Sequence, residues 1–196
     1  IDDKTPTAAE EIWDGLDGAG ASTTSVGGLV GAAGNSGVFN YINTFSGVTL
    51  NAAARKGSGT KNSDGASSAA GNSAWDFALT TSETGVDGLS IGAGYGEAET
   101  GSTAQTAGGD GEDKHMTGFA NYSYGPVTVG YQMSSIDVGG SGSSSEYADQ
   151  WGVALNVNES LSVSYGEREV EYTKTNGNAA VTEDGEGIAI AYTMGS

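Results

Sequence analysis

The sequence predicts an all-β chain that forms a transmembrane antiparallel up-and-down β-barrel. Three observations support this fold class: apolar side chains alternate with polar ones, short turns alternate with long loops, and large hydrophobic residues are too few for a second apolar layer. Of the 196 residues, 34 are Gly and only 36% are hydrophobic. No apolar run approaches the ~20 residues that a membrane-spanning helix needs, which excludes a helical membrane protein.

The alternation is clearest in the hairpin at 122–133, which reads YSYGPVTVGYQM. Successive side chains of a strand point to opposite faces, so Val127 and Val129 share one face while Thr128 and Gln132 share the other. One face is apolar and aromatic, and the other is small and polar. A soluble sandwich shows the same pattern with its apolar face turned inward, so the hairpin alone leaves both alternatives open.

The same period-2 pattern predicts about nine strands, most of them near the ~9 to 11 residues of a tilted membrane strand. They are expected at 36–43, 48–56, 73–81, 88–98, 115–124, 127–136, 147–157, 161–172 and 187–194.

The connections between these strands favour the membrane barrel over the sandwich. Short turns are expected at 44–47, 82–87, 125–126 and 158–160, and long loops rich in Gly, Ser and Asp at 57–72, 99–114, 137–146 and 173–186. Short and long connections alternate strictly, so all long loops fall at one end. This arrangement is typical of outer-membrane barrels with periplasmic turns and extracellular loops.

Aromatic residues also suggest two membrane interfaces. Trp75 and Trp151 are expected at the long-loop end of their strands, and Phe45 and Tyr124 at the short-turn end. The polar face then lines water without being catalytic. Its predicted lumen-lining residues are Asn51, Asp76, Thr128, Gln132, Asn156, Ser162 and Ser164.

Charge and the rarer residue types exclude several function classes. The chain has 25 acidic and 7 basic residues, a net charge of -18 and a single His, with no Cys. Phosphate binding relies on Lys and Arg, so nucleic acid is a poor partner, and cations are a better one. Disulfides, cysteine zinc sites and histidine clusters are excluded. We expect no enzyme, because no nucleophile with an oriented base is evident.

Residues 1–35 differ from the strands that follow at 36–196. Thr5 as N-cap, Pro6 at the first helical position and Gly15 as a stop predict a short helix. Before the first strand, this segment is expected to be a loop that folds inward. A solvated acidic loop helix is the alternative that the residues leave open.

Two stretches carry a resemblance to a known family: GVFNYINTFSGVTLNAAARKG, a strand, turn and strand, and ANYSYGPVTVGYQ. Together with the acidic segment before them, they make the chain resemble the general porins of Gram-negative outer membranes, particularly the alphaproteobacterial kind. The resemblance implies a 16-stranded barrel, a homotrimer, and neighbours that are outer-membrane lipid and lipopolysaccharide. It also implies that the loop after the fifth strand narrows the pore.

If residues 1–35 are that loop, the nine strands correspond to the sixth through fourteenth of the family. About nine strands leave two edges without partners, which a bilayer does not tolerate. We therefore expect the sequence to be an internal portion of a longer protein.

A porin constriction sets acids on the inward loop against Arg on the wall. The predicted acids are Asp2, Asp3, Glu10, Glu11, Asp14 and Asp17. The predicted wall bases are Arg55, which we favour, and Arg168. For Arg168 the alternative is an interfacial position paired with Glu167 or Glu169.

Carboxylates could also bind Ca²⁺ through hard oxygen ligands. The weak candidates are Asp2 and Asp3 in one place and Asp110, Glu112 and Asp113 in another. Their spacing matches neither an EF-hand loop nor the G-G-x-G-x-D repeat, and no other cofactor is expected.

Together the residues and the resemblance predict a passive outer-membrane channel for ions and small hydrophilic solutes, with a preference for cations. The alternative function is a secreted or surface-layer β-rich adhesin that binds Ca²⁺.

Overall fold

A computed structural model describes residues 38–55, 73–99, 112–137, 144–174 and 180–193. The described part forms one sheet of nine strands in the order β1 to β9, each antiparallel to the next. The strands are β1 (Val38–Phe45), β2 (Val48–Arg55), β3 (Ala74–Thr81), β4 (Leu89–Glu99), β5 (Glu112–Tyr124), β6 (Val127–Asp137), β7 (Ser144–Asn158), β8 (Leu161–Lys174) and β9 (Val181–Tyr192).

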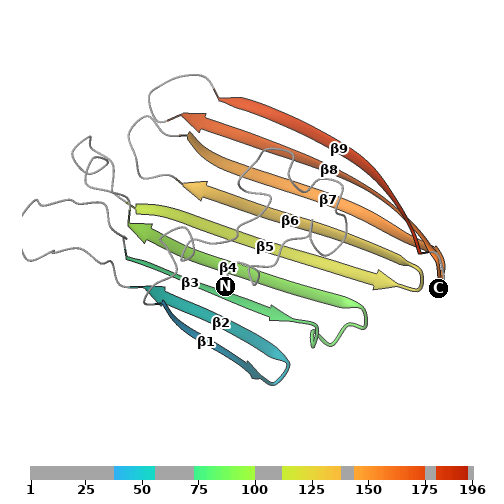
Figure 1. The fold of residues 1–196 in the computed structure, drawn as a ribbon, viewed down its shortest axis with the longest axis horizontal. Helices are drawn as coiled ribbons and strands as arrows, with labels where there is room; N and C mark the ends of the chain where they lie inside the picture. Colours follow the sequence, from blue (N-terminus) through green and yellow to red (C-terminus); the bar gives the residue numbers. More distant parts are fainter. Residues whose placement is uncertain (1–37, 56–72, 100–111, 138–143, 175–179, 194–196) are drawn as a thin grey trace, which may run out of the picture.

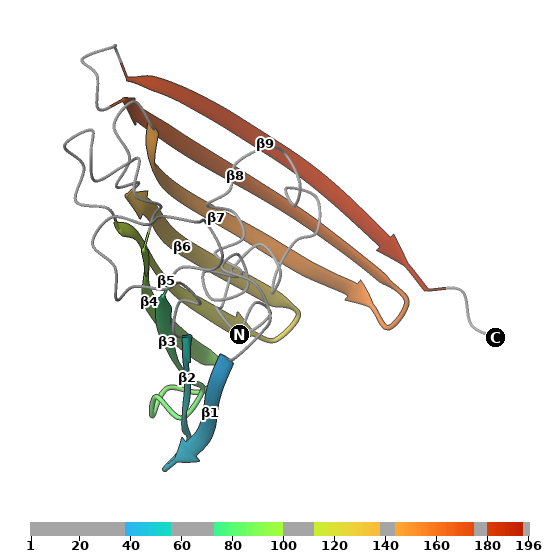
Figure 2. The ribbon, with the colours of Figure 1, turned by 60° about the vertical axis from the view of Figure 1, so that its left-hand side comes forward.

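This topology confirms the predicted all-β, up-and-down fold. Figure 1 shows the strands side by side in chain order, and Figure 2 shows that the sheet is strongly curved, with β1 and β9 at its two margins. Within the described residues we find no helix of sufficient length and apolarity to cross a membrane.

Two hairpin turns explain how consecutive strands reverse direction so tightly. Ser46 and Gly47 have φ of 49° and 80°, and positive φ at both central positions is the signature of a type I′ turn. Gly125 has φ of 60° and precedes Pro126, whose ring fixes φ near −65°. That combination fits a type II′ turn.

The register shows that the strands are tilted relative to the line of short turns. We followed the register partners across the sheet, starting from Phe45–Val48, the pair next to the first turn. On β8 the residue reached in this way is Glu167. On β8, however, the short-turn end lies six residues away, at Leu161. Six residues of ~3.3 Å across the six strand spacings of ~4.8 Å from β2 to β8 give a tilt of about 35°. Membrane barrels have tilts of roughly 35–45°.

Three details of the sequence prediction are wrong. Thr44 and Phe45 belong to β1, so the first turn contains only Ser46 and Gly47. Strand β9 begins at Val181, so much of the predicted loop at 173–186 is strand. Strand β7 begins at Ser144, which places Trp151 in the middle of its strand rather than at an end.

The buried clusters are small. One joins Ala148 and Val170 with Tyr172 beside them, and another joins Ala53 and Ala74. Small side chains of this kind cannot form the thick interior of a two-layer domain. The described sheet is therefore a single layer, and its two faces have to be compared directly.

Candidate functional site

The two faces of the sheet differ in chemistry and in burial. We call the face that carries Gln132 and Arg168 the inner face, and the face that carries Val129 and Ile190 the outer face. Gln132 is 0% and Arg168 4% exposed, whereas Val129 is 43% and Ile190 70% exposed. A soluble sandwich buries its apolar set and exposes its polar set. The described sheet does the reverse, which is the sidedness of a barrel with lipid outside and water inside.

A row of polar side chains crosses the inner face. Gln132, Gln150 and Arg168 are direct neighbours in register on β6, β7 and β8. A second row beside it consists of glycines on β6 to β9, namely Gly130, Gly152, Gly166 and Gly187. Because glycine has no side chain, nothing projects from the inner face of the sheet along this row, next to the polar row.

Hydrogen bonds fix part of the polar row. Gln132 donates from Nε2 to Ser134 Oγ over 2.8 Å, and the hydroxyl groups of Ser134 and Thr117 lie 3.1 Å apart. All of these residues are buried on the inner face. A network that is satisfied in this way holds the rotamers of its members.

Other inner-face groups have no hydrogen-bond partner. The side-chain oxygens of Asn51, Asn121 and Gln150 are buried and unpaired. Buried polar atoms are normally paired with protein or with water, because an unpaired one costs about 1–3 kcal/mol. These unpaired acceptors are spread over β2, β5 and β7.

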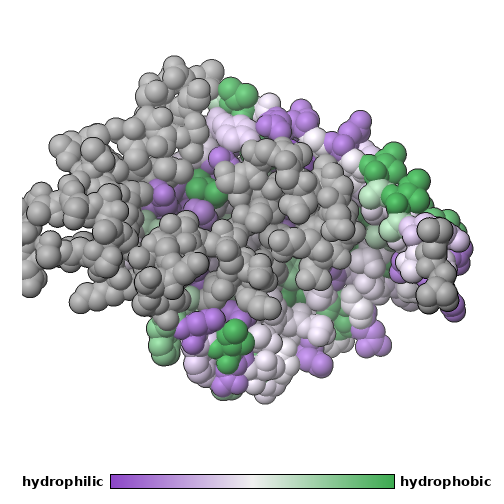
Figure 3. All heavy atoms as spheres, in the orientation of Figure 1, coloured by the Kyte–Doolittle hydropathy of each residue, from purple (hydrophilic) through white to green (hydrophobic). Residues whose placement is uncertain are grey.

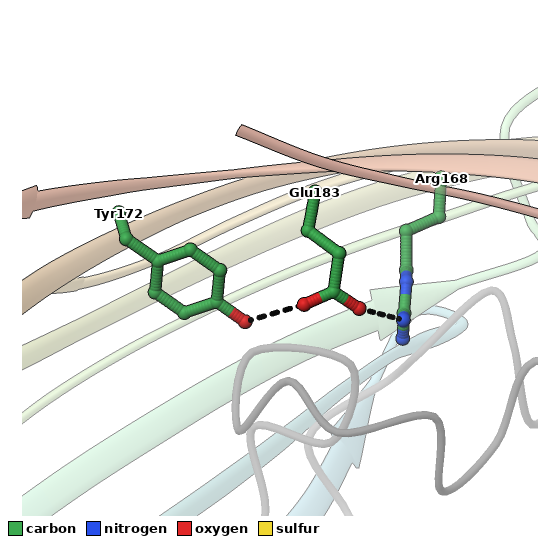
Figure 4. Close-up of polar contacts among 3 residues, drawn as sticks. All are labelled: Arg168, Tyr172 and Glu183. Carbon is green, nitrogen blue, oxygen red and sulfur yellow. Dashed lines mark hydrogen bonds and ion pairs between the residues drawn. The ribbon is translucent and has the colours of Figure 1, made fainter. Parts of the chain in front are cut away.

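Arg168 makes the ion pair of the inner face at the β8–β9 margin. Its Nη2 donates to Glu183 Oε1 over 3.1 Å, and Tyr172 donates from its hydroxyl to Glu183 Oε2 over 3.4 Å. Figure 4 shows the carboxylate of Glu183 between the guanidinium and the phenol. This geometry excludes Glu167 and Glu169 as its partners, since alternation puts both on the outer face.

Acids outnumber bases on the described inner face. By register its acids are Asp76 on β3, Asp113 on β5, Glu146 on β7 and Glu183 on β9. Arg168 is the base whose side chain is described on that face. An excess of fixed negative charge raises the local concentration of cations.

The outer face carries an apolar band with aromatic groups at its upper limit. Trp75, Phe77 and Tyr95 pack together there, with ring centroids 5.6 to 6.3 Å apart. On β7 and β8 the limit lies at Trp151 and Tyr165, whose centroids are 5.7 Å apart. Aromatic residues at such limits are typical of membrane–water interfaces.

Beyond that limit the outer face of β7 to β9 becomes acidic. Asp149, Glu167, Glu169, Asp184 and Glu186 surround an open hollow of about 600 Å³ beside Trp151. Figure 3 shows hydrophobic surface over the part of β9 toward its C-terminal end. Ile188 and Ile190 of this strand are 71% and 70% exposed. In the described residues no three acidic or histidine side chains are placed to hold a metal ion.

The residues predicted to line the lumen share one face. By register Asn51, Asp76, Thr128, Gln132, Asn156, Ser162 and Ser164 all lie on the inner face. Their burial differs, since Gln132, Asn51 and Asp76 are buried and Asn156 is exposed. Their role in lining a channel stays a prediction.

Most of the predicted constriction and calcium residues lie outside the described part of the chain. This holds for Asp2, Asp3, Glu10, Glu11, Asp14, Asp17 and Asp110, and with them for the predicted loop at 1–35. Arg55 and Glu112 end β2 and begin β5, but their side chains are also outside it. Asp113 lies in β5 on the inner face.

Sequence reasoning missed Glu183. It lies in TEDGE, a stretch whose charge and Gly content suggested a loop. The signal that was available is alternation: Thr182, Asp184, Glu186 and Ile188 fall on one face and Glu183 and Gly185 on the other. That pattern continues the strand toward its N-terminal end.

Comparison with known protein families identifies a match to this chain. A model of the family described as Gram-negative porin matches residues 3–196. Among curated proteins, none matches the chain.

Proposed function

Because the chain belongs to the Gram-negative porin family, we propose that it forms a water-filled outer-membrane channel through which ions and small hydrophilic solutes diffuse, with a preference for cations. Family membership implies the outer-membrane location, and it suggests a channel rather than an enzyme. The observation that carries the proposal is the sidedness of the sheet, with polar side chains on the inner face and apolar ones on the outer face.

The proposed mechanism needs no binding step. Solutes diffuse past polar inner-face side chains that exchange hydrogen bonds with water, such as the exposed Asn156. Selectivity arises from the field of the inner-face carboxylates, which attracts cations and repels anions. The strength of that field falls with ionic strength, because the Debye length shortens from about 30 Å at 0.01 M to about 10 Å at 0.1 M.

The experiment is a reversal-potential measurement on the protein in planar lipid bilayers under a KCl gradient. The sign of the potential is expected to indicate that K⁺ permeates faster than Cl⁻, and the preference is expected to weaken at high salt. An anion preference would overturn the selectivity. Failure to form channels at all would overturn the proposal, and a chain that stays soluble without detergent would support the adhesin instead.

Assembly and surroundings form part of the same proposal. Three copies are proposed to associate in the membrane, with outer-membrane lipid and lipopolysaccharide as their neighbours. Chemical cross-linking in detergent is expected to give a trimer. Ca²⁺ at Asp110, Glu112 and Asp113 stays a prediction, and a calcium titration followed by calorimetry tests it.

A further inference from the structure

The Arg168–Glu183 ion pair is strongly asymmetric in its exposure. The side chain of Arg168 is 2% exposed, and that of Glu183 is 45% exposed. A permeating ion therefore meets the carboxylate before it meets the guanidinium. The wall here presents negative charge, although it contains a base.

The backbone of β9 and the packing against it explain why Arg168 is buried and Glu183 is exposed. Gly185 is the register partner of Arg168 on the neighbouring strand β9. A Cβ built on Gly185 would lie 3.3 Å from Arg168 Nε and 3.8 Å from its Cζ. Arg168 thus lies close over the β9 backbone at a place where any side chain would crowd it. From there it reaches Glu183, two residues along β9.

Tyr172 holds the other oxygen of the same carboxylate. It lies one inner-face position beyond Val170, and its hydroxyl donates to Oε2 while Arg168 donates to Oε1. Two donors on two oxygens fix the carboxylate in one orientation, and hydrogen bonds from a charged donor are the stronger kind.

The height of this group follows from the strand geometry. On β9 the apolar band ends near Ile188, five residues from Glu183. Five residues of ~3.3 Å on a strand tilted by about 35° place Glu183 about 14 Å beyond the hydrocarbon, on the side of the long loops. It therefore lies at the mouth of the proposed channel.

We propose that Glu183 is a selectivity-determining residue at the mouth of the channel, and that Arg168, Tyr172 and Gly185 are positioning residues for it. This inference rests on the proposed channel function. It replaces the idea that Arg168 acts as an exposed base on the wall.

The test uses the full chain in planar bilayers, with the reversal potential measured in dilute KCl. Glu183→Gln is expected to lower the ratio of K⁺ to Cl⁻ permeability about twofold, the effect of one unit charge several ångströms from the ion path at low salt. The matched control is Glu171→Gln on β8, which removes the same charge from the outer face. It is expected to leave the ratio unchanged.

A second variant distinguishes the effect of charge at position 183 from an effect of the substitution on folding. The chain has no Cys, so Glu183→Cys introduces a single thiol. An anionic methanethiosulfonate reagent is expected to restore the wild-type ratio in open channels, and a cationic one to shift it further toward Cl⁻. Arg168→Cys, whose position is buried, is expected to react much more slowly.

The outcomes separate this inference from the proposed function. The role of Glu183 would be overturned if the channels conduct but their permeability ratio changes neither with Glu183→Gln nor with the charge of the thiol reagent. The proposed channel function would still stand. An equal response of the Glu171→Gln control would also overturn it. If wild-type protein forms no channels, the proposed function itself fails.

Discussion

Leu155→Arg tests the sidedness of the sheet at one position. Leu155 lies on the outer face of β7, beside Val127 of β6 and Val163 of β8 in register, and it is 41% exposed. It lies between Trp151 at the upper limit of the apolar band and the short turn after Asn158, so we expect it near the middle of the bilayer.

The size of the effect can be worked from the structure. The exposed 41% of Leu155 corresponds to roughly 70 Å², and at ~25 cal/mol per Å² its transfer from water to hydrocarbon contributes about 2 kcal/mol. An Arg on the lipid face near the midplane costs a further ~2–4 kcal/mol. We therefore expect Leu155→Arg to lower the free energy of unfolding by about 4–6 kcal/mol. The same substitution on a water-exposed surface would change it by about 0.5 kcal/mol or less.

The assay is equilibrium unfolding by guanidinium chloride of the protein folded in phosphatidylcholine vesicles, followed by tryptophan fluorescence. Asn156→Arg is the matched control, because the next residue along β7 lies on the inner face and is exposed there. It is expected to stay within about 1 kcal/mol of wild type, since a hydrated Arg costs little. A small loss for Leu155→Arg together with a large loss for Asn156→Arg would refute the assignment of the two faces.

Two further predictions concern a turn and an interface. Gly88→Ala is expected to lower the free energy of unfolding by about 2–4 kcal/mol, because the residue has φ of 80° and an added Cβ would overlap the Ser123 carbonyl oxygen. Gly85→Ala, at φ of 79° with open space around it, is expected to cost only about 1–2 kcal/mol, and equal losses in guanidinium unfolding would contradict this. In a variant that keeps Trp151 as its single Trp, fluorescence is expected to be quenched more strongly by lipids brominated near the headgroup than by lipids brominated deep in the chain. Stronger quenching by the deep label would place Trp151 away from the interface.

The strands could be predicted from sequence because lipid imposes a strict alternation. Val127, Val129 and Tyr131 cannot be exchanged for polar residues without exposing polar groups to hydrocarbon, so the period-2 signal is strong across the membrane. Short turns such as Gly125–Pro126 restrict φ and are equally readable. The predicted order of the strands is therefore confirmed.

The part of β9 beyond the bilayer could not be predicted in the same way. There both faces meet water, so Thr182, Asp184 and Glu186 take charged and polar residue types that also occur in loops. The contrast between the two faces is lost there, so the sequence pattern predicts a strand that begins at Gly187 instead of Val181. The partner of Arg168 was missed for this reason, since the pairing depends on a part of β9 where alternation is present but is carried by polar residues on both faces.

The lack of a thick interior has a consequence for how the protein reaches its native state. Side chains such as Ile188 and Ile190, which an ordinary domain would hide against one another during collapse, stay uncovered in the finished sheet. In the described residues the buried hydrophobic side chains are few, namely Ala53, Ala74, Ala78, Ile136, Ala148 and Val170, so burial within the sheet supplies little of the hydrophobic stabilisation that an ordinary domain gains. Folding of the sheet and its insertion into the bilayer are therefore expected to be coupled.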